Sequence, residues 1–168
     1  MARSSRLSRR GLLALPVLTG LAACGFELRR EPEFAFQSLA MTGFAPESPL
    51  AEELRRQLRQ SPLQLVQDPS KAQVVLEALR DSRERSVVVS TSAGQVREWQ
   101  LKLQLDYLVR TPGGEPLLPI TELRMSREMS YLESQALAKE QEEAQLYRAM
   151  QYDAAAQVMR RLASVRLR

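Results

Sequence analysis

Residues 99–109 alternate between apolar and polar side chains, and this alternation constrains the fold more than any other feature of the chain. One face carries Trp99, Leu101, Leu103, Leu105, Tyr107 and Val109. The other face carries Glu98, Gln100, Lys102, Gln104 and Asp106. A period of two over this length predicts a half-buried antiparallel strand. The chain must therefore cover one side of a sheet and leave the other side to water or to a partner.

A first helix is predicted between Ser48 and Pro62. Ser48 can cap the helix, and Pro49 suits the first helical position because its missing N–H would have no partner there. One apolar stripe at intervals of four residues is formed by Leu50, Leu54 and Leu58. Such a stripe is typical of a helix that packs on a sheet.

A long second helix is predicted over residues 135–162. Its apolar positions, at spacings of three and four, are Tyr147, Met150, Ala154, Val158 and Leu162. Residues 34–41, 63–66, 72–91 and 123–131 are interpreted as extended, and the charged middle of the segment 72–91 suggests a bulge or a bend.

The order of these elements predicts an α/β (α+β-like) two-layer sandwich. The first two long strands are joined through a helix, so they should be parallel with a right-handed crossover, whereas the later hairpins should be antiparallel. We expect a mixed four-stranded sheet with two helices packed on one face.

Cys24, the only cysteine, directly follows a predicted lipoprotein signal peptide that spans residues 1–23. A basic segment with four arginines precedes thirteen mostly apolar residues, 11–23, which end in Leu-Ala-Ala before Cys24. This ending resembles a lipobox, with Cys24 as the lipidated residue. Thirteen residues interrupted by Pro16 are too short for a membrane-spanning helix, which needs roughly 20. A structural free cysteine is the other alternative, and the arginine pair at 9–10 leaves open a twin-arginine export signal.

The predicted processing removes the apparent basic character of the chain. The whole chain has 24 basic and 20 acidic residues, and the four signal arginines leave 20 of each. A nucleic-acid-binding protein is expected to keep a basic excess, so no nucleic-acid partner is expected. The absence of histidine excludes Ser-His-Asp catalysis and histidine metal sites. We therefore expect no enzymatic activity, metal or cofactor; a carboxylate-based periplasmic hydrolase is the enzymatic alternative.

Four motifs in order resemble the LptE family of lipoproteins. Residues 24–29 (CGFELR) resemble the family's Cys-Gly-aromatic-x-Leu-Arg, and residues 94–101 (GQVREWQL) resemble its Gly-x-x-x-Glu-aromatic-x-Leu hairpin. Residues 136–143 (ALAKEQEE) resemble the start of its last helix, and residues 160–162 (RRL) its end. The resemblance covers nearly the whole chain after Cys24. It divides the chain into a signal peptide (1–23), a lipidated tether (24–33) and one domain (34–168).

The resemblance implies an outer-membrane lipoprotein that plugs the LptD β-barrel, helps to assemble it and binds lipopolysaccharide for insertion into the outer leaflet. Gly25 in place of aspartate after the cysteine agrees with an outer-membrane address. An accessory lipoprotein of an ABC-type lipid transport system, which would also place a small α/β domain behind a lipobox, is the alternative function.

The expected ligand carries phosphates, which lysine and arginine bind through charge-assisted hydrogen bonds. Lys139 matches the lysine of the family's Ala-Leu-Ala-Lys segment and is the first candidate; its alternative is an ordinary pair with Glu143. Some family members carry a basic residue at the hairpin tip, where this chain has Ser92, Ala93 and Gly94. Arg97 and Arg127 are the candidates that would replace it.

Overall fold

One five-stranded sheet organises residues 33–167, which are the residues described in a computed structural model of the chain. The strands are β1 (Ser38–Thr42), β2 (Gln64–Leu65), β3 (Val74–Ser90), β4 (Val96–Arg110) and β5 (Pro116–Ser130), in the spatial order β2-β1-β3-β4-β5. Two helices, α2 (Pro49–Arg59) and α3 (Ala136–Ala163), accompany it, with short 3₁₀ turns η2 (Pro69–Lys71) and η3 (Glu133–Gln135). The predicted signal peptide, Cys24 and the predicted tether up to residue 32 lie outside the described residues.

The predicted α/β architecture is confirmed, but the predicted count of four strands is wrong. The fifth strand is β2, which pairs in parallel with β1 through Ser38–Gln64 and Leu39–Leu65. The parallel pairing of β1 with β3 and the two antiparallel hairpins agree with the prediction. The segment 63–66 is extended as predicted, but a strand of two residues is defined by its pairing partner rather than by a sequence pattern of its own.

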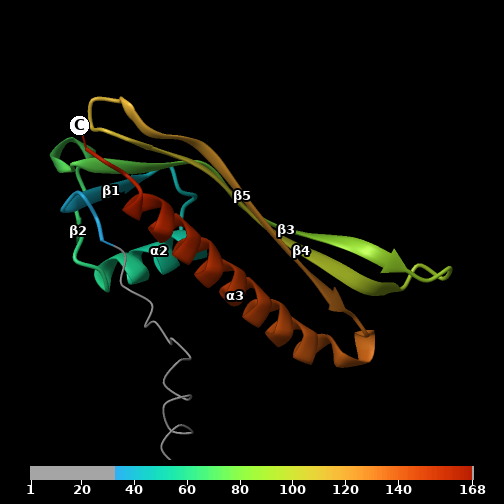
Figure 1. Cartoon of the computed structure of the whole chain (residues 1–168). Helices are drawn as coiled ribbons and strands as arrows, with labels where there is room; N and C mark the ends of the chain where they lie inside the picture. The colour runs from blue at the N-terminus through green and yellow to red at the C-terminus, as the bar shows by residue number, and fades with distance from the viewer. Residues whose placement is uncertain (1–32, 168) are drawn as a thin grey trace, which may run out of the picture. The chain divides into compact units, whose positions relative to one another are not determined.

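Both helices form as predicted and pack on the same face of the sheet. The Ser48 hydroxyl accepts a hydrogen bond from the Ala51 backbone N–H at 3.0 Å, and Pro49 is the first residue of α2. The leucines of the α2 stripe and the apolar positions predicted in α3 are all buried. They meet the apolar face of β4, whose Leu101 and Leu105 are fully buried. Figure 1 shows α2 and α3 together on this side of the sheet.

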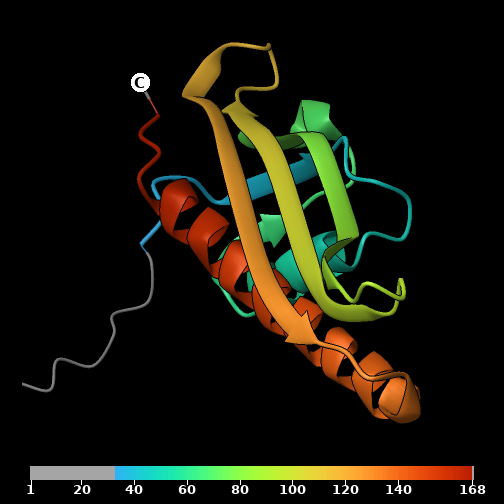
Figure 2. The ribbon, with the colours of Figure 1, turned by 90° about the vertical axis from the view of Figure 1, so that its right-hand side faces the viewer.

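The strands β3 and β4 extend far beyond β1 and α2, so that α3 is the only one of the two helices that runs beside the outer part of the hairpin (Figure 1). We call this outer part, with the end of β5 and the start of α3, the distal end. Figure 2 shows β3, β4 and β5 side by side, with α3 crossing behind them. A bulge between Ala78 and Arg80 separates the two halves of β3. This confirms the predicted irregularity in the charged middle of the strand.

The bulge changes which residues of β3 face the helices. Before it, the inward positions have even numbers, and Val74, Leu76 and Ala78 are buried in the core. After it, Arg83 and Arg85 lie opposite Leu103 and Leu101, whose side chains point to the helices. The distal half of β3 therefore presents arginines to α3 where its proximal half presents aliphatic side chains.

Candidate functional site

The tip of the β3–β4 hairpin is a turn closed by Thr91. The Thr91 N–H donates to the Gln95 carbonyl at 2.8 Å, and the Gly94 N–H donates to the Thr91 carbonyl at 2.9 Å. The Thr91 hydroxyl also accepts from the Gln95 N–H at 3.1 Å. Gly94 has a φ of 78°, which an L-residue adopts only with strain. The segment Ser92 to Gly94 is thus a well-defined turn whose side chains carry no charge.

Arg97 lies beside this tip, in a surface hollow of about 580 Å³. The hollow is lined by tip residues Ala93 and Gly94, by Arg97 and by Tyr131 to Ser134, which lead into α3. The Tyr131 N–H donates to the Arg97 carbonyl at 2.8 Å and so joins the two walls. The Arg97 guanidinium donates to the Gln95 side chain at 3.3 Å and has no ion-pair partner among residues 33–167. Its charge is therefore available to a ligand.

Lys139, the first candidate from the sequence, is held by its own chain. Its Nζ donates to the Ser130 hydroxyl at 3.1 Å and to the Glu142 carboxylate at 2.8 Å, and its side chain is only 14% exposed. The carboxylate partner is thus Glu142 rather than Glu143. The bond to Ser130 attaches the first turn of α3 to the end of β5, and the bond to Glu142 lies within α3. Together they leave one of the three ammonium donors for a ligand.

Arg127 does not join the cluster at the tip. It is four residues from Tyr131 along β5, a separation of about 13 Å at 3.3 Å per residue. Its guanidinium lies 3.9 Å from the Asp153 carboxylate of α3 and donates to the Ser126 carbonyl at 2.9 Å. The structure therefore brings Arg97 and the tip together, places Lys139 at the neighbouring end of β5, and leaves Arg127 facing the middle of α3.

An arginine–aromatic cluster behind the hollow was missed in the sequence. The Arg85 guanidinium lies 4.4 Å from the ring centre of Trp99 and pairs with the Glu143 carboxylate at 2.7 Å. Tyr131 contacts the same indole edge-on, with ring centres 6.2 Å apart. The Trp99 Nε1 is buried without a hydrogen-bond partner in the described structure. Trp99 thus packs within the sheet, as predicted, while it also lines the hollow.

A second arginine, Arg83, stacks on Tyr147 of α3 with its guanidinium carbon 5.0 Å from the ring centre. The Tyr147 hydroxyl donates to the Glu84 carbonyl at 2.7 Å. Burial raises the pKa of Tyr147, the Glu143 carboxylate adds to the rise, and Arg83 and Arg85 oppose it. Arg83, Arg85 and Val87 lie at alternate positions and so share one face of β3, which is the signal that the sequence offers for this cluster. Which face they share depends on the bulge between Ala78 and Arg80.

Residues 33–167 contain no group of three or more histidine, cysteine, aspartate or glutamate side chains placed to hold a metal ion. In the same part of the chain, no helix is long and apolar enough to span a membrane. The chemistry that the distal end offers is the binding of anions by an unpaired guanidinium, next to an aromatic surface and polar backbone groups.

The fold is shared with solved structures of bacterial lipoproteins. The solution structure of an uncharacterized lipoprotein B from Nitrosomonas europaea matches with a TM-score of 0.71 and 25% identity, over 83% of this chain and 91% of that one. The rare lipoprotein B from Shewanella oneidensis matches with a TM-score of 0.61 and 25% identity, over 75% and 94%. The fold thus places this chain in the class of two-layer α/β domains to which these lipoproteins belong.

Sequence comparison then identifies the family. Residues 36–162 match the family LptE, described as Lipopolysaccharide-assembly. The LPS-assembly lipoprotein LptE of Photorhabdus laumondii is 31% identical over 158 residues, which cover 92% of this chain and 84% of that protein. The protein of the same name from Yersinia enterocolitica is 32% identical over 156 residues, covering 90% and 73%. The chain belongs to the LptE family of lipoproteins involved in lipopolysaccharide assembly, which fits the expectation that it is not an enzyme.

Proposed function

We propose that this chain is an outer-membrane lipoprotein, anchored through Cys24, that plugs and helps to assemble an LptD-like β-barrel and binds lipopolysaccharide for insertion into the outer leaflet. The observation that carries the proposal is the family match over residues 36–162, which spans the whole sheet and nearly all of α3. A lipid anchor a few residues before the domain would keep it beside the barrel that it enters.

The distal end is the proposed contact for the phosphates of the ligand. Arg97 is its main cation, because its guanidinium has no carboxylate partner within the described structure and lies beside the tip in the hollow. Lys139 contributes its remaining donor, and its two internal bonds hold the ammonium in a fixed position. Arg127 is a weaker candidate for phosphate binding, since its guanidinium already lies beside the Asp153 carboxylate.

Binding of purified lipopolysaccharide by the detergent-solubilised protein tests the ligand assignment. Arg97→Glu should lower affinity by roughly 10- to 100-fold, because it removes one charge-assisted contact, worth about 1.5–3 kcal/mol, and introduces repulsion. Arg160→Glu is the matched control, since it makes the same charge change at an exposed position in the last turn of α3. Equal loss in both variants would mean that only overall charge matters, and no loss in Arg97→Glu would remove Arg97 from the site.

Affinity purification from outer membranes tests the partner. Recovery of an LptD-like barrel in mild detergent is the expected result. A preparation that contains no barrel contradicts the plug assignment, and recovery of an inner-membrane permease would support the ABC-type transport alternative.

A further inference from the structure

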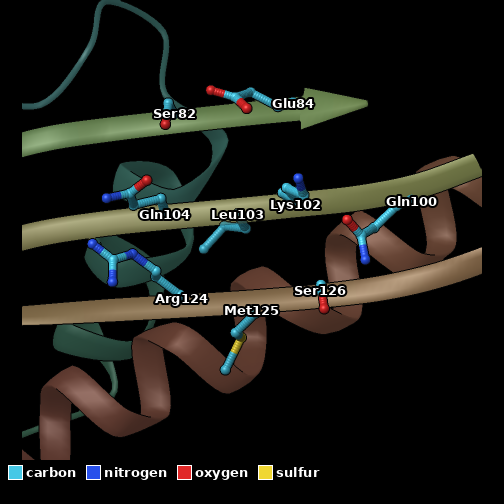
Figure 3. A pocket seen from close by; sticks show the side chains of 9 residues that line it. All are labelled: Ser82, Glu84, Gln100, Lys102, Leu103, Gln104, Arg124, Met125 and Ser126. Atoms are coloured by element: carbon cyan, nitrogen blue, oxygen red, sulfur yellow. The ribbon is translucent and has the colours of Figure 1, made fainter. Parts of the chain in front are cut away.

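The sheet face that points away from the helices carries an ordered array of polar side chains. Two rows run across β3, β4 and β5, and in each row the residues lie directly opposite one another. The rows are Ser82–Gln104–Arg124 and Glu84–Lys102–Ser126. We call these six residues the polar grid. Figure 3 shows them on three adjacent strands, with the helix ribbon behind.

The polar grid surrounds a shallow hollow of about 260 Å³. Gln100 extends the lining along β4, and Leu103 and Met125 also contribute to it, although both belong to the strand positions that face the helices. The hollow thus has polar walls and an apolar floor. Because the walls stand on hydrogen-bonded strands, their positions are set before any partner arrives, which lowers the entropic cost of binding.

Hydrogen bonds and ion pairs occupy the rim of the polar grid but not its centre. At the rim, Arg124 pairs with Glu122 at 2.6 Å, and the Gln104 amide donates to Asp106 at 3.0 Å. At the centre, Lys102 and Glu84 lie directly opposite, where Cβ atoms are about 5 Å apart. Nevertheless neither group forms an ion pair in the part of the chain that the structure describes.

The chemistry of this centre selects its partner. One cation, one anion and two serine hydroxyls give a nearly neutral surface, and the Glu84 carboxylate would repel a phosphate. No aromatic side chain lines the hollow, so it offers no flat apolar surface for a sugar ring. Protein side chains of mixed charge fit such a surface, and the interior of a membrane barrel is polar. Polar contacts between two proteins can be bridged by ordered water and still be nearly as favourable as direct hydrogen bonds.

We infer that the polar grid is the surface by which this domain docks against the inner wall of its barrel partner, and this inference rests on the proposed function. The distal hollow then remains open to the ligand. The helix side offers a poorer surface near α2, because Glu52 pairs with Arg55 and Glu53 with Arg56, each at 2.6 Å.

Site-specific photo-crosslinking of the full lipidated chain in cells tests the docking surface. A photoreactive residue replaces Gln100 or Ser126 beside the grid centre, and matched controls carry it at Arg59 of α2 or Arg160 of α3, both exposed. Crosslinks to the barrel at the first pair and not at the second are expected. Crosslinks at the controls alone, or equally at all four positions, would overturn the inference, as would crosslinks from the grid to lipopolysaccharide instead of the barrel.

A charge variant gives a second readout. Lys102→Glu places a carboxylate opposite Glu84 and should lower the amount of co-purified barrel by about tenfold, while Arg160→Glu leaves it unchanged. Thermal unfolding of both variants confirms that each is folded. If the barrel co-purifies undiminished with folded Lys102→Glu, the docking surface is wrong and the plug assignment stands. If the unsubstituted chain recovers no barrel at all, the proposed function fails and the docking surface with it.

Discussion

Gly43 is the position at which a single added methyl group should do most damage to this fold. It follows β1 with a φ of 76°, and a Cβ built there would lie 2.1 Å from the Ala78 carbonyl oxygen and 3.1 Å from its carbon. Ala78 borders the bulge of β3, so the obstacle is backbone that cannot rotate away as a side chain would. Gly43→Ala therefore forces β1 and the bulge apart.

The expected loss has two parts. Holding an L-residue in the left-handed region costs about 1–2 kcal/mol. Overpacking against a neighbour that yields only partly costs about 1–3 kcal/mol. Together they lower the free energy of unfolding by about 2–5 kcal/mol, a large share of the roughly 5–15 kcal/mol typical of a domain. At about 3 °C per kcal/mol for a domain of this size, Tm should fall by about 6–15 °C.

Thermal unfolding followed by circular dichroism and by the fluorescence of the single tryptophan, Trp99, measures this loss. Two glycines of the β4–β5 turn separate the causes. Gly114 has a φ of 94° and open space at its Cβ position, so Gly114→Ala should show only the backbone cost. Gly113 has an ordinary φ and its nearest atom at 3.7 Å, so Gly113→Ala should cost little. The reasoning is refuted if Gly43→Ala loses no more stability than Gly114→Ala.

Three further outcomes follow from the contacts described above. Arg85→Ala should cost about 1 kcal/mol and shift the Trp99 emission, because the guanidinium over the indole is lost; an unchanged spectrum would contradict the stacking. Burial acts to raise the pKa of Glu53, but hydrogen bonds from Arg56 and Gln57 and the charge of Arg56 outweigh burial, so the pKa is lowered. The ionised Glu53 therefore stabilises the fold above the unfolded-state pKa, and this stabilisation is lost as pH falls through the folded-state pKa. Glu53→Gln should therefore reduce the loss of stability below about pH 4, as measured by urea unfolding against pH. Hydrogen exchange should be faster for the β4-bonded amides of residues 80–90 than for those of 74–78, and equal protection would show that the distal end is no weaker.

Local chemistry explains which elements could be predicted from the sequence. The start of α2 depends on Ser48 and Pro49, and the face of β4 depends on an alternation that no bulge interrupts between Trp99 and Tyr107. Such features are complete within a short segment, so they can be read without a partner. The two residues of β2 have no such signal, because only the ladder with β1 makes them a strand.

The candidate site was harder to predict because its contacts join distant segments. A pair with Glu143 at the next helical turn was the alternative role for Lys139, but Glu143 is held by Arg85, 58 residues earlier in the chain. Lys139 pairs instead with Glu142 and with Ser130 of β5. Because of the bulge between Ala78 and Arg80, the side chain of Arg85 lies on the helix side of the sheet. The alternation of residues in β3 does not by itself indicate where this change of face occurs.

The two halves of the hairpin are stabilised by different forces, and this difference suits the proposed position of the ligand at the distal end. The proximal half buries aliphatic side chains between the sheet and two helices, and their burial contributes stability that salt and ligands hardly affect. In the distal half, the buried leucines of β4 are joined from β3 by Arg83 and Arg85, which stack on aromatic rings, and by one ion pair; the energies of these contacts are smaller and depend on local charge. A bound anion beside Arg97 would act on this second set of contacts. The end of the domain that responds most to a charged ligand is therefore the end at which we place that ligand.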